Sequence, residues 1–415
     1  MRKSLEQTRR ELSQALYQHD AACRVICRLM KEKEEIGKML ALSHEKVEEY
    51  KSQLASQVDQ KPGFVREEKP DEGIYKELVV RMEKLCDSLQ HQRKELKPPA
   101  DYPKQLTGYQ EKAKYAGHDS TKPGILDFDI HPLQENYILS GGRDSKVVLL
   151  DHAKGSVVKK FEPFDSKKQR AITVARFVPG MTELYGLLGA SDGSAGLWNL
   201  EESRETYAIK CHTAGITDLS FQPLNEYVAI SSKDKSWSFH NLLQGVKLAQ
   251  FHEDQEIKSI QFQPDGLMLL TGLKDGTIKL YDVRSHQQIA IVDSFKGELS
   301  QITFSNKGLN FAVAWSTSDI ARVFNLRKLG KEVYELKHDS NVQSVCFDKY
   351  GQTLVTGAGQ GLNVYQASKQ WTEGPIYTNN KAHENGIVSA ARFSGSGRML
   401  VSAGSEDRFL KVFEL

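Results

Sequence analysis

The chain is poor in the features that mark secreted, membrane-spanning and nucleic-acid-binding proteins. Its five cysteines are odd in number and scattered, which predicts reduced thiols in a cytosolic or nuclear compartment; they are Cys23, Cys27, Cys86, Cys211 and Cys346. The sequence has no run of about 18 apolar residues and no basic, apolar leader. Lysine and arginine total 56 against 54 acidic residues. A net charge of +2 gives no reason to expect a membrane or a nucleic acid as a direct partner.

Motifs of common enzymes and metal sites are also missing. The chain contains no GxxxxGK[ST] phosphate loop and no HExxH zinc motif. Gly189, Ser191 and Gly193 match the GxSxG nucleophile pattern, but that pattern requires a strand-to-helix turn and here falls in a predicted hairpin. Cys23 and Cys27 stand one helical turn apart, and no second pair nearby completes four ligands. We therefore predict no catalytic residue, no metal and no cofactor.

Instead, the chain contains one sequence motif that recurs seven times between Gly124 and Leu415. Each copy is an apolar strand, a turn of small residues that usually holds an Asp, and a second apolar strand followed by an acidic or amide residue. The copies are YILSGGRDSKVVLLD from Tyr137, YGLLGASDGSAGLWN from Tyr185, YVAISSKDKSWSFHN from Tyr227, LMLLTGLKDGTIKLYD from Leu267, FAVAWSTSDIARVFN from Phe311, TLVTGAGQGLNVYQ from Thr353 and MLVSAGSEDRFLKVFE from Met399.

The spacing of the turn acids predicts an all-β, seven-bladed propeller over residues 112–415. The acids are Asp144, Asp192, Asp234, Asp275, Asp319 and Asp407; the first five are 48, 42, 41 and 44 residues apart, and the last follows at 88. Gln360 replaces the acid in the sixth copy. A unit of about 40 to 45 residues carrying four short strands is typical of propeller blades.

Each turn acid is expected to accept hydrogen bonds from its own turn and from a polar side chain in the preceding loop. His212 before Asp234 and His383 before Asp407 are the candidate partners. Because these residues recur with the architecture, we predict a structural role for them. The pattern resembles WD-repeat proteins, although only Trp198 keeps Trp at the aromatic position; the other copies carry Leu150, His240, Tyr281, Phe324, Tyr365 and Phe413.

The first third of the chain has a helical pattern. Between residues 5 and 54, apolar residues recur at heptad spacing with no proline, which predicts a coiled-coil oligomerisation helix over residues 1–58. His19 and Lys33 interrupt its seam. The predicted seam comprises Leu5, Leu12, His19, Ile26, Leu29, Ile36, Leu40 and Val47.

A charged linker with Pro62 and Gly63 covers residues 59–73, and an amphipathic helix is predicted over 74–97, where Pro98 and Pro99 end it. We expect this helix to lean on the coiled coil or on a partner. Residues 98–111 form a second linker. The last copy ends at its third strand, so a segment within residues 112–118 is expected to pair with it and close the ring.

The stretch RRELSQALYQHDAACRVICRL, from Arg9 to Leu29, closely resembles the central coiled coil of the pre-mRNA-processing factor nineteen family. The resemblance continues through PGI at Pro123, QPDGL at Gln263, FNLRKL at Phe324 and KQWTE at Lys369. It implies a nuclear scaffold of the spliceosome-associated nineteen complex. In that family, coiled coils form a homotetramer and bind splicing proteins that include a Myb-like subunit, while the propellers recruit client proteins.

Members of that family normally begin with a U-box, the domain that binds a ubiquitin-conjugating enzyme. Here Met1 stands just before the predicted coiled coil, and helices and linkers fill residues 1–115. Two hypotheses remain open at this point. The chain is a non-catalytic splicing scaffold, or it is an E3 ubiquitin ligase that acts through a domain absent from this chain or contributed by a full-length partner in a mixed tetramer.

Overall fold

The computed structural model describes residues 72–95, 98, 102–103, 108–122, 124–164, 170–181, 183–285, 287–329, 332–367, 371, 374–384 and 386–415. The predicted coiled coil and all its seam residues lie outside these ranges. Among the described helices, none is long and apolar enough to cross a membrane.

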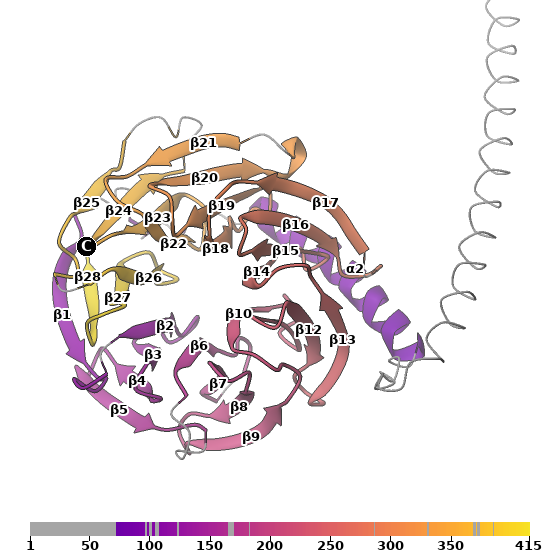
Figure 1. The fold of residues 1–415 in the computed structure, drawn as a ribbon, viewed down its shortest axis with the longest axis horizontal. Helices are drawn as coiled ribbons and strands as arrows, with labels where there is room; N and C mark the ends of the chain where they lie inside the picture. Colours follow the sequence, from indigo (N-terminus) through magenta and orange to yellow (C-terminus); the bar gives the residue numbers. More distant parts are fainter. Residues whose placement is uncertain are drawn as a thin grey trace, which may run out of the picture. The chain divides into compact units, whose positions relative to one another are not determined.

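Seven antiparallel sheets of four strands each stand around a central axis (Figure 1). This arrangement confirms the predicted seven-bladed propeller. Blade 1 comprises β2 (Ile125–Ile130), β3 (Tyr137–Gly142), β4 (Val147–Asp151) and β5 (Ser156–Phe161); blade 2, β6 (Ile172–Phe177), β7 (Tyr185–Ala190), β8 (Ala195–Asn199) and β9 (Arg204–Ile209); blade 3, β10 (Ile216–Phe221), β11 (Tyr227–Ser232), β12 (Ser236–Asn241) and β13 (Val246–His252).

The remaining blades repeat the same order from the axis outward. Blade 4 comprises β14 (Ile257–Phe262), β15 (Met268–Leu273), β16 (Thr277–Asp282) and β17 (Gln287–Ser294); blade 5, β18 (Leu299–Phe304), β19 (Asn310–Trp315), β20 (Ile320–Asn325) and β21 (Glu332–Lys337), with the 3-10 turn η1 (Leu326–Lys328); blade 6, β22 (Val342–Phe347), β23 (Thr353–Ala358), β24 (Gly361–Gln366) and β25 (Tyr377–Asn379); blade 7, β26 (Val388–Phe393), β27 (Met399–Gly404), β28 (Phe409–Glu414) and β1 (Gln110–Ala116).

The hydrophobic core lies between neighbouring blades. All six residues of β11 are buried, whereas five of the six residues of β5 are exposed. The middle strands are therefore covered on both faces, and the outermost strands meet solvent. One core cluster joins Ile125 and Phe128 of blade 1 to Val401 and Val412 of blade 7, so each blade completes the core of the next.

The ring closes through the segment before blade 1, as predicted, with a strand that begins two residues before the expected range of 112–118. β1 pairs antiparallel with β28, with Ala113 opposite Val412 and Tyr115 opposite Leu410. The closing strand begins at Gln110 and ends at Ala116. It comes from the chain segment before blade 1, so blade 7 combines both ends of the propeller sequence.

A belt of hydrogen bonds links the innermost strands around the axis. The third residue of one inner strand accepts a bond from a backbone N–H of the next: Asp127 from Ala175 at 3.1 Å, Asp218 from Ile260 at 3.2 Å, Ser259 from Ile302 at 3.2 Å, Gln301 from Val345 at 3.0 Å and Ser344 from Ala391 at 3.0 Å. Each bond satisfies a buried amide that would otherwise lose its partner.

The belt is interrupted at two positions, where the equivalent residues are Val174 and Ala390 and cannot accept a bond. An arginine bridges each interruption. Arg176 pairs with Asp127 and lies 3.5 Å from Asp218, which joins blades 1, 2 and 3. Arg392 Nη2 lies 3.2 Å from Asp127, which joins blades 7 and 1.

The helix α2 (Glu72–Glu95) packs on the propeller. The sequence pattern predicted that it leans on the coiled coil or a partner. Among the described residues, its buried Leu78 and Met82 instead join the core cluster of blades 3 and 4. The segment between α2 and β1 is also anchored to the ring. Tyr102 donates to Asp348 at 2.7 Å, and Tyr109 donates to the Gly397 carbonyl at 2.7 Å.

Candidate functional site

Three of the predicted turn acids bind a buried histidine. Each histidine comes from the loop before the first strand of a blade, and each acid comes from the turn between the second and third strands. Because a carboxylate only accepts, Nδ1–H of the histidine is the donor. The pairs are His118 with Asp144 at 2.9 Å, His212 with Asp234 at 3.0 Å and His383 with Asp407 at 2.7 Å.

The second ring nitrogen of each histidine contacts a serine hydroxyl. Nε2 lies 3.0 Å from Ser140 in blade 1, 2.8 Å from Ser238 in blade 3 and 2.9 Å from Ser402 in blade 7. Asp–His–Ser is the connectivity of a nucleophilic hydrolase triad. Here it occurs three times, with Ser140 and Ser402 in the second strands β3 and β27 and Ser238 in the third strand β12. Each serine is fully buried, so a substrate cannot reach the hydroxyl. The arrangement fastens turns to loops and is structural.

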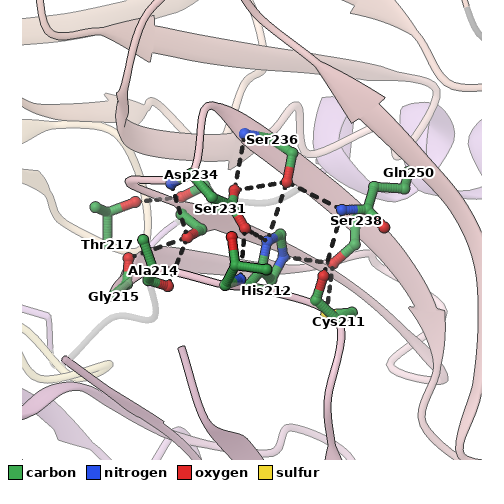
Figure 2. Close-up of polar contacts among 12 residues, drawn as sticks. Cys211, His212, Ala214, Gly215, Thr217, Ser231, Asp234, Ser236, Ser238 and Gln250 are labelled. Carbon is green, nitrogen blue, oxygen red and sulfur yellow. Dashed lines mark hydrogen bonds and ion pairs between the residues drawn. The ribbon is translucent and has the colours of Figure 1, made fainter. Parts of the chain in front are cut away.

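Figure 2 shows the most extensive of these networks, in blade 3. Asp234 also accepts from Ser236 Oγ at 2.6 Å and from the Thr213 N–H at 2.9 Å. Burial acts to raise the pKa of Asp234, but these bonds and His212 outweigh burial and lower it. The carboxylate is therefore held ionised inside the turn.

Cys211 and His240 extend the blade 3 network. Ser238 Oγ lies 2.8 Å from His240 Nε2 and 3.3 Å from Cys211 Sγ. Because His212 Nδ1–H donates to Asp234, His212 Nε2 accepts the hydroxyl proton of Ser238. Ser238 Oγ therefore accepts from His240 Nε2–H. Burial, aided by the nearby His212 and Lys247, lowers the pKa of His240 to about 3. Burial raises the pKa of the Cys211 thiol to about 11, which leaves it protonated and a poor nucleophile.

The other turn acids have different partners. Asp192 accepts from the Ser194 N–H at 3.0 Å and pairs with Arg170 at 2.8 Å, and Asp275 accepts from the Thr277 N–H at 3.0 Å. In blade 5 the corresponding bond, from Ile320 N–H at 3.1 Å, goes to Ser318 and not to Asp319. The turn there is placed one residue earlier, because β20 already begins at Ile320.

Three residues of these networks escaped the sequence analysis. Glu253 stands four residues before β14, as His212 stands before β10, and its carboxylate binds Lys279 Nζ at 2.6 Å and the Tyr281 hydroxyl. His338 stands four residues before β22 and contacts Thr356 Oγ1 at 2.8 Å. A search for a polar side chain four residues before the first strand, the position of His212, would have found both. The third, His118, lies in the lead to the ring, where no strand motif marked it.

A polar cavity of about 100 Å³ lies on the axis and is lined by residues of all seven blades. Asp127, Arg176 and Asp218 contribute to its lining, and hydroxyls of Thr173, Thr217, Ser300 and Ser389 surround them. Burial raises the pKa of Asp218 even though Arg176 acts in the opposite direction. The cavity can hydrogen-bond a small polar group. Its charged residues are already paired, Asp127 and Asp218 with Arg176, and Lys258 with Glu298 outside the lining.

The GxSxG match is part of a structural turn. Ser191 of the GxSxG match lies in the turn between β7 and β8, which confirms the predicted hairpin. Within the described ranges, no group of three or more His, Cys, Asp or Glu side chains is placed to hold a metal ion. Cys211 and Cys346 are free thiols. Cys23 and Cys27 lie outside the described residues.

Comparisons with known proteins agree with this architecture. The family model described as Prp19/Pso4-like matches residues 1–42, and the WD domain, G-beta repeat model matches residues 203–241 and 374–414. A third model, described as the N-terminal domain of nucleolar protein 10-like proteins, matches residues 230–369 inside the same ring.

Curated proteins match the whole chain. Pre-mRNA-processing factor 19 of Oryza sativa subsp. japonica is 30% identical over 434 residues, with 100% of this chain and 80% of the rice protein covered. Pre-mRNA-processing factor 19 homolog 2 of Arabidopsis thaliana is 30% identical with the same coverage. Pre-mRNA-processing factor 19 of Bos taurus is 30% identical over 433 residues, with 82% of the bovine protein covered.

Proposed function

This chain belongs to the pre-mRNA-processing factor 19 family, and from that membership we propose that it is a non-catalytic scaffold subunit of the nuclear splicing machinery. The observation that carries the proposal is the likeness over 100% of the chain, which spans both the coiled-coil region and the propeller. A protein that shared only the propeller would share a fold and not a function.

In this proposal the two parts of the chain do different work. Residues 1–58 assemble four copies and bind other splicing proteins, including a Myb-like subunit. The propeller recruits clients. Its buried Asp–His–Ser networks support a binding role over a catalytic one, because these reactive side chains hydrogen-bond one another and hold loops to turns.

The proposal is tested in a splicing-competent nuclear extract of the source species from which this protein has been depleted. Depletion should stop conversion of a reporter pre-mRNA to mRNA, and adding back the wild-type chain should restore it. The double variant Leu12→Asp, Ile26→Asp should not restore splicing, because it places charges in the predicted seam. Lys159→Ala, on the exposed strand β5, is the matched control and should restore it. Splicing that continues unchanged after depletion would refute the proposal.

A further inference from the structure

The helix α2 occupies a groove formed by blades 3 and 4. Its buried stripe consists of Leu78, Met82 and Cys86, spaced four residues apart, with 3%, 0% and 4% of their surfaces exposed. Leu78 and Met82 join a cluster with Tyr227 of blade 3 and Val283 of blade 4. In Figure 1 the helix passes behind the strands of these two blades.

Opposite charges flank the buried stripe. Arg81 of the helix binds both carboxylate oxygens of Glu226, at 2.7 and 2.9 Å, in the loop between β10 and β11. Glu83 of the helix lies 3.1 Å from Arg284, in the loop between β16 and β17. The groove therefore offers an acid on one side and a base on the other, and this order fixes the direction in which a helix can lie.

The helix is an addition to the ring and fills its groove only in part. All seven sheets have their four strands without it, since β1 closes blade 7. Beside Leu78 and Arg81 a cavity of about 380 Å³ remains, lined on the propeller side by Tyr227, Asn241 and Leu243. Leu243, at its edge, keeps 64% of its surface exposed.

We propose that this groove is a helix-binding site for partner proteins, which α2 occupies from its own chain until a partner helix displaces it. The docked α2 shows which chemistry fits. The partner helix has apolar residues at i and i+4, a basic residue at i+3 and an acidic residue at i+5, as in Leu78, Met82, Arg81 and Glu83. The open space beside Leu78 favours a larger apolar side chain at position i. Such a helix would lay its apolar face in the groove.

The test uses a fluorescein-labelled peptide of residues 72–95 and the full-length chain. Fluorescence anisotropy should show at least tenfold tighter binding to Met82→Asp than to the wild type, because the charge expels the chain's own helix and frees the groove. A peptide with Leu78→Phe should bind tighter than the wild-type peptide. A folded Met82→Asp chain that binds no peptide would overturn the proposal.

Charge reversal is the control for specificity. A peptide carrying Arg81→Glu and Glu83→Arg should lose about tenfold in affinity for the Met82→Asp chain. It should regain that affinity when the chain also carries Glu226→Arg and Arg284→Glu. Equal binding of both peptides to both chains would show nonspecific adsorption and overturn the proposal. The proposal would also be overturned if a Met82→Asp copy bound the α2 of a wild-type copy, because the groove would then serve exchange of α2 between copies of this chain.

One further variant guards against misfolding. If Met82→Asp lowers the melting temperature of the whole ring, a chain with Arg81→Glu and Glu83→Arg replaces it. These substitutions leave the apolar stripe intact and turn both flanking pairs into repulsions. The inference concerns the propeller alone, so it can fail while the splicing function stands, and the reverse also holds.

Discussion

Replacing His240 with Phe should make the propeller less sensitive to acid. His240 is buried in blade 3, and burial lowers its pKa to about 3 from an ordinary value of 6.5. Above pH 6.5 the side chain is neutral in both folded and unfolded chains, so its titration does not change the free energy of unfolding. As the pH falls below 6.5 the unfolded chain takes up a proton that the folded chain refuses. At pH 5 this difference amounts to about 2 kcal/mol lost from the free energy of unfolding.

Phe is a suitable replacement because the structure already uses it at this position. Phe324 and Phe413 are the equivalent residues of blades 5 and 7. The hydroxyl of Ser238 keeps His212 and Cys211 as partners, so the substitution leaves no buried polar atom of this network unpaired. His252→Phe, at the exposed end of β13, is the matched control.

The measurement is urea unfolding at pH 7.5 and at pH 5, followed by tryptophan fluorescence. Trp237 reports on blade 3, because it is buried and its ring stacks on that of Phe251, with the ring centroids 4.0 Å apart. Between the two pH values, His240→Phe should lose about 2 kcal/mol less than the wild type does. The wild type and the variant both remain partly sensitive to acid, because burial also lowers the pKa of His212 and His338, which both chains retain. Identical losses in wild type and His240→Phe would refute the reasoning.

Three other predictions concern assembly, closure and chemistry. The double variant Leu12→Asp, Ile26→Asp should sediment as a monomer with an intact propeller, since each seam side chain is expected to contribute about 1.5 to 3 kcal/mol when buried; a tetramer would contradict the predicted seam. Removing residues 1–116 should lower the melting temperature far more than removing residues 1–98, because only the longer deletion takes away β1 and exposes the edge of β28; equal melting temperatures would disprove the role of β1 in closure. The purified chain, mixed with ubiquitin, activating enzyme and conjugating enzyme, should form no ubiquitin chains above background, because helices and linkers are predicted over residues 1–109 and β1 belongs to the propeller; robust autoubiquitination would favour the ligase hypothesis.

The number of blades followed from local pattern, whereas the closing strand was inferred from the missing fourth strand of the last copy. The seven repeated phrases each encode two neighbouring strands and their turn, and residues that are close in sequence decide such hairpins. The same locality explains why His212 and His383 could be matched to their turn acids, which follow 22 and 24 residues later. Asp319 shows the limit of this reasoning, because a shift of one residue in the turn passed the bond to Ser318.

The sequence by itself determined the ring, because every blade repeats the same alternation and can bury its faces only against neighbouring blades. Only the tertiary structure decided what lies against the ring and across its axis. Arg81 and Glu226 are 145 residues apart, Tyr102 and Asp348 are 246 apart, and Arg392 and Asp127 are 265 apart. No local pattern encodes such pairs, since each depends on how the blades turn about the axis and on where the chain before β1 crosses the loops. The sequence therefore did not predict the groove that holds α2, the arginine bridges of the inner belt or the anchoring of the segment between α2 and β1. Only the closed ring brings these residues together.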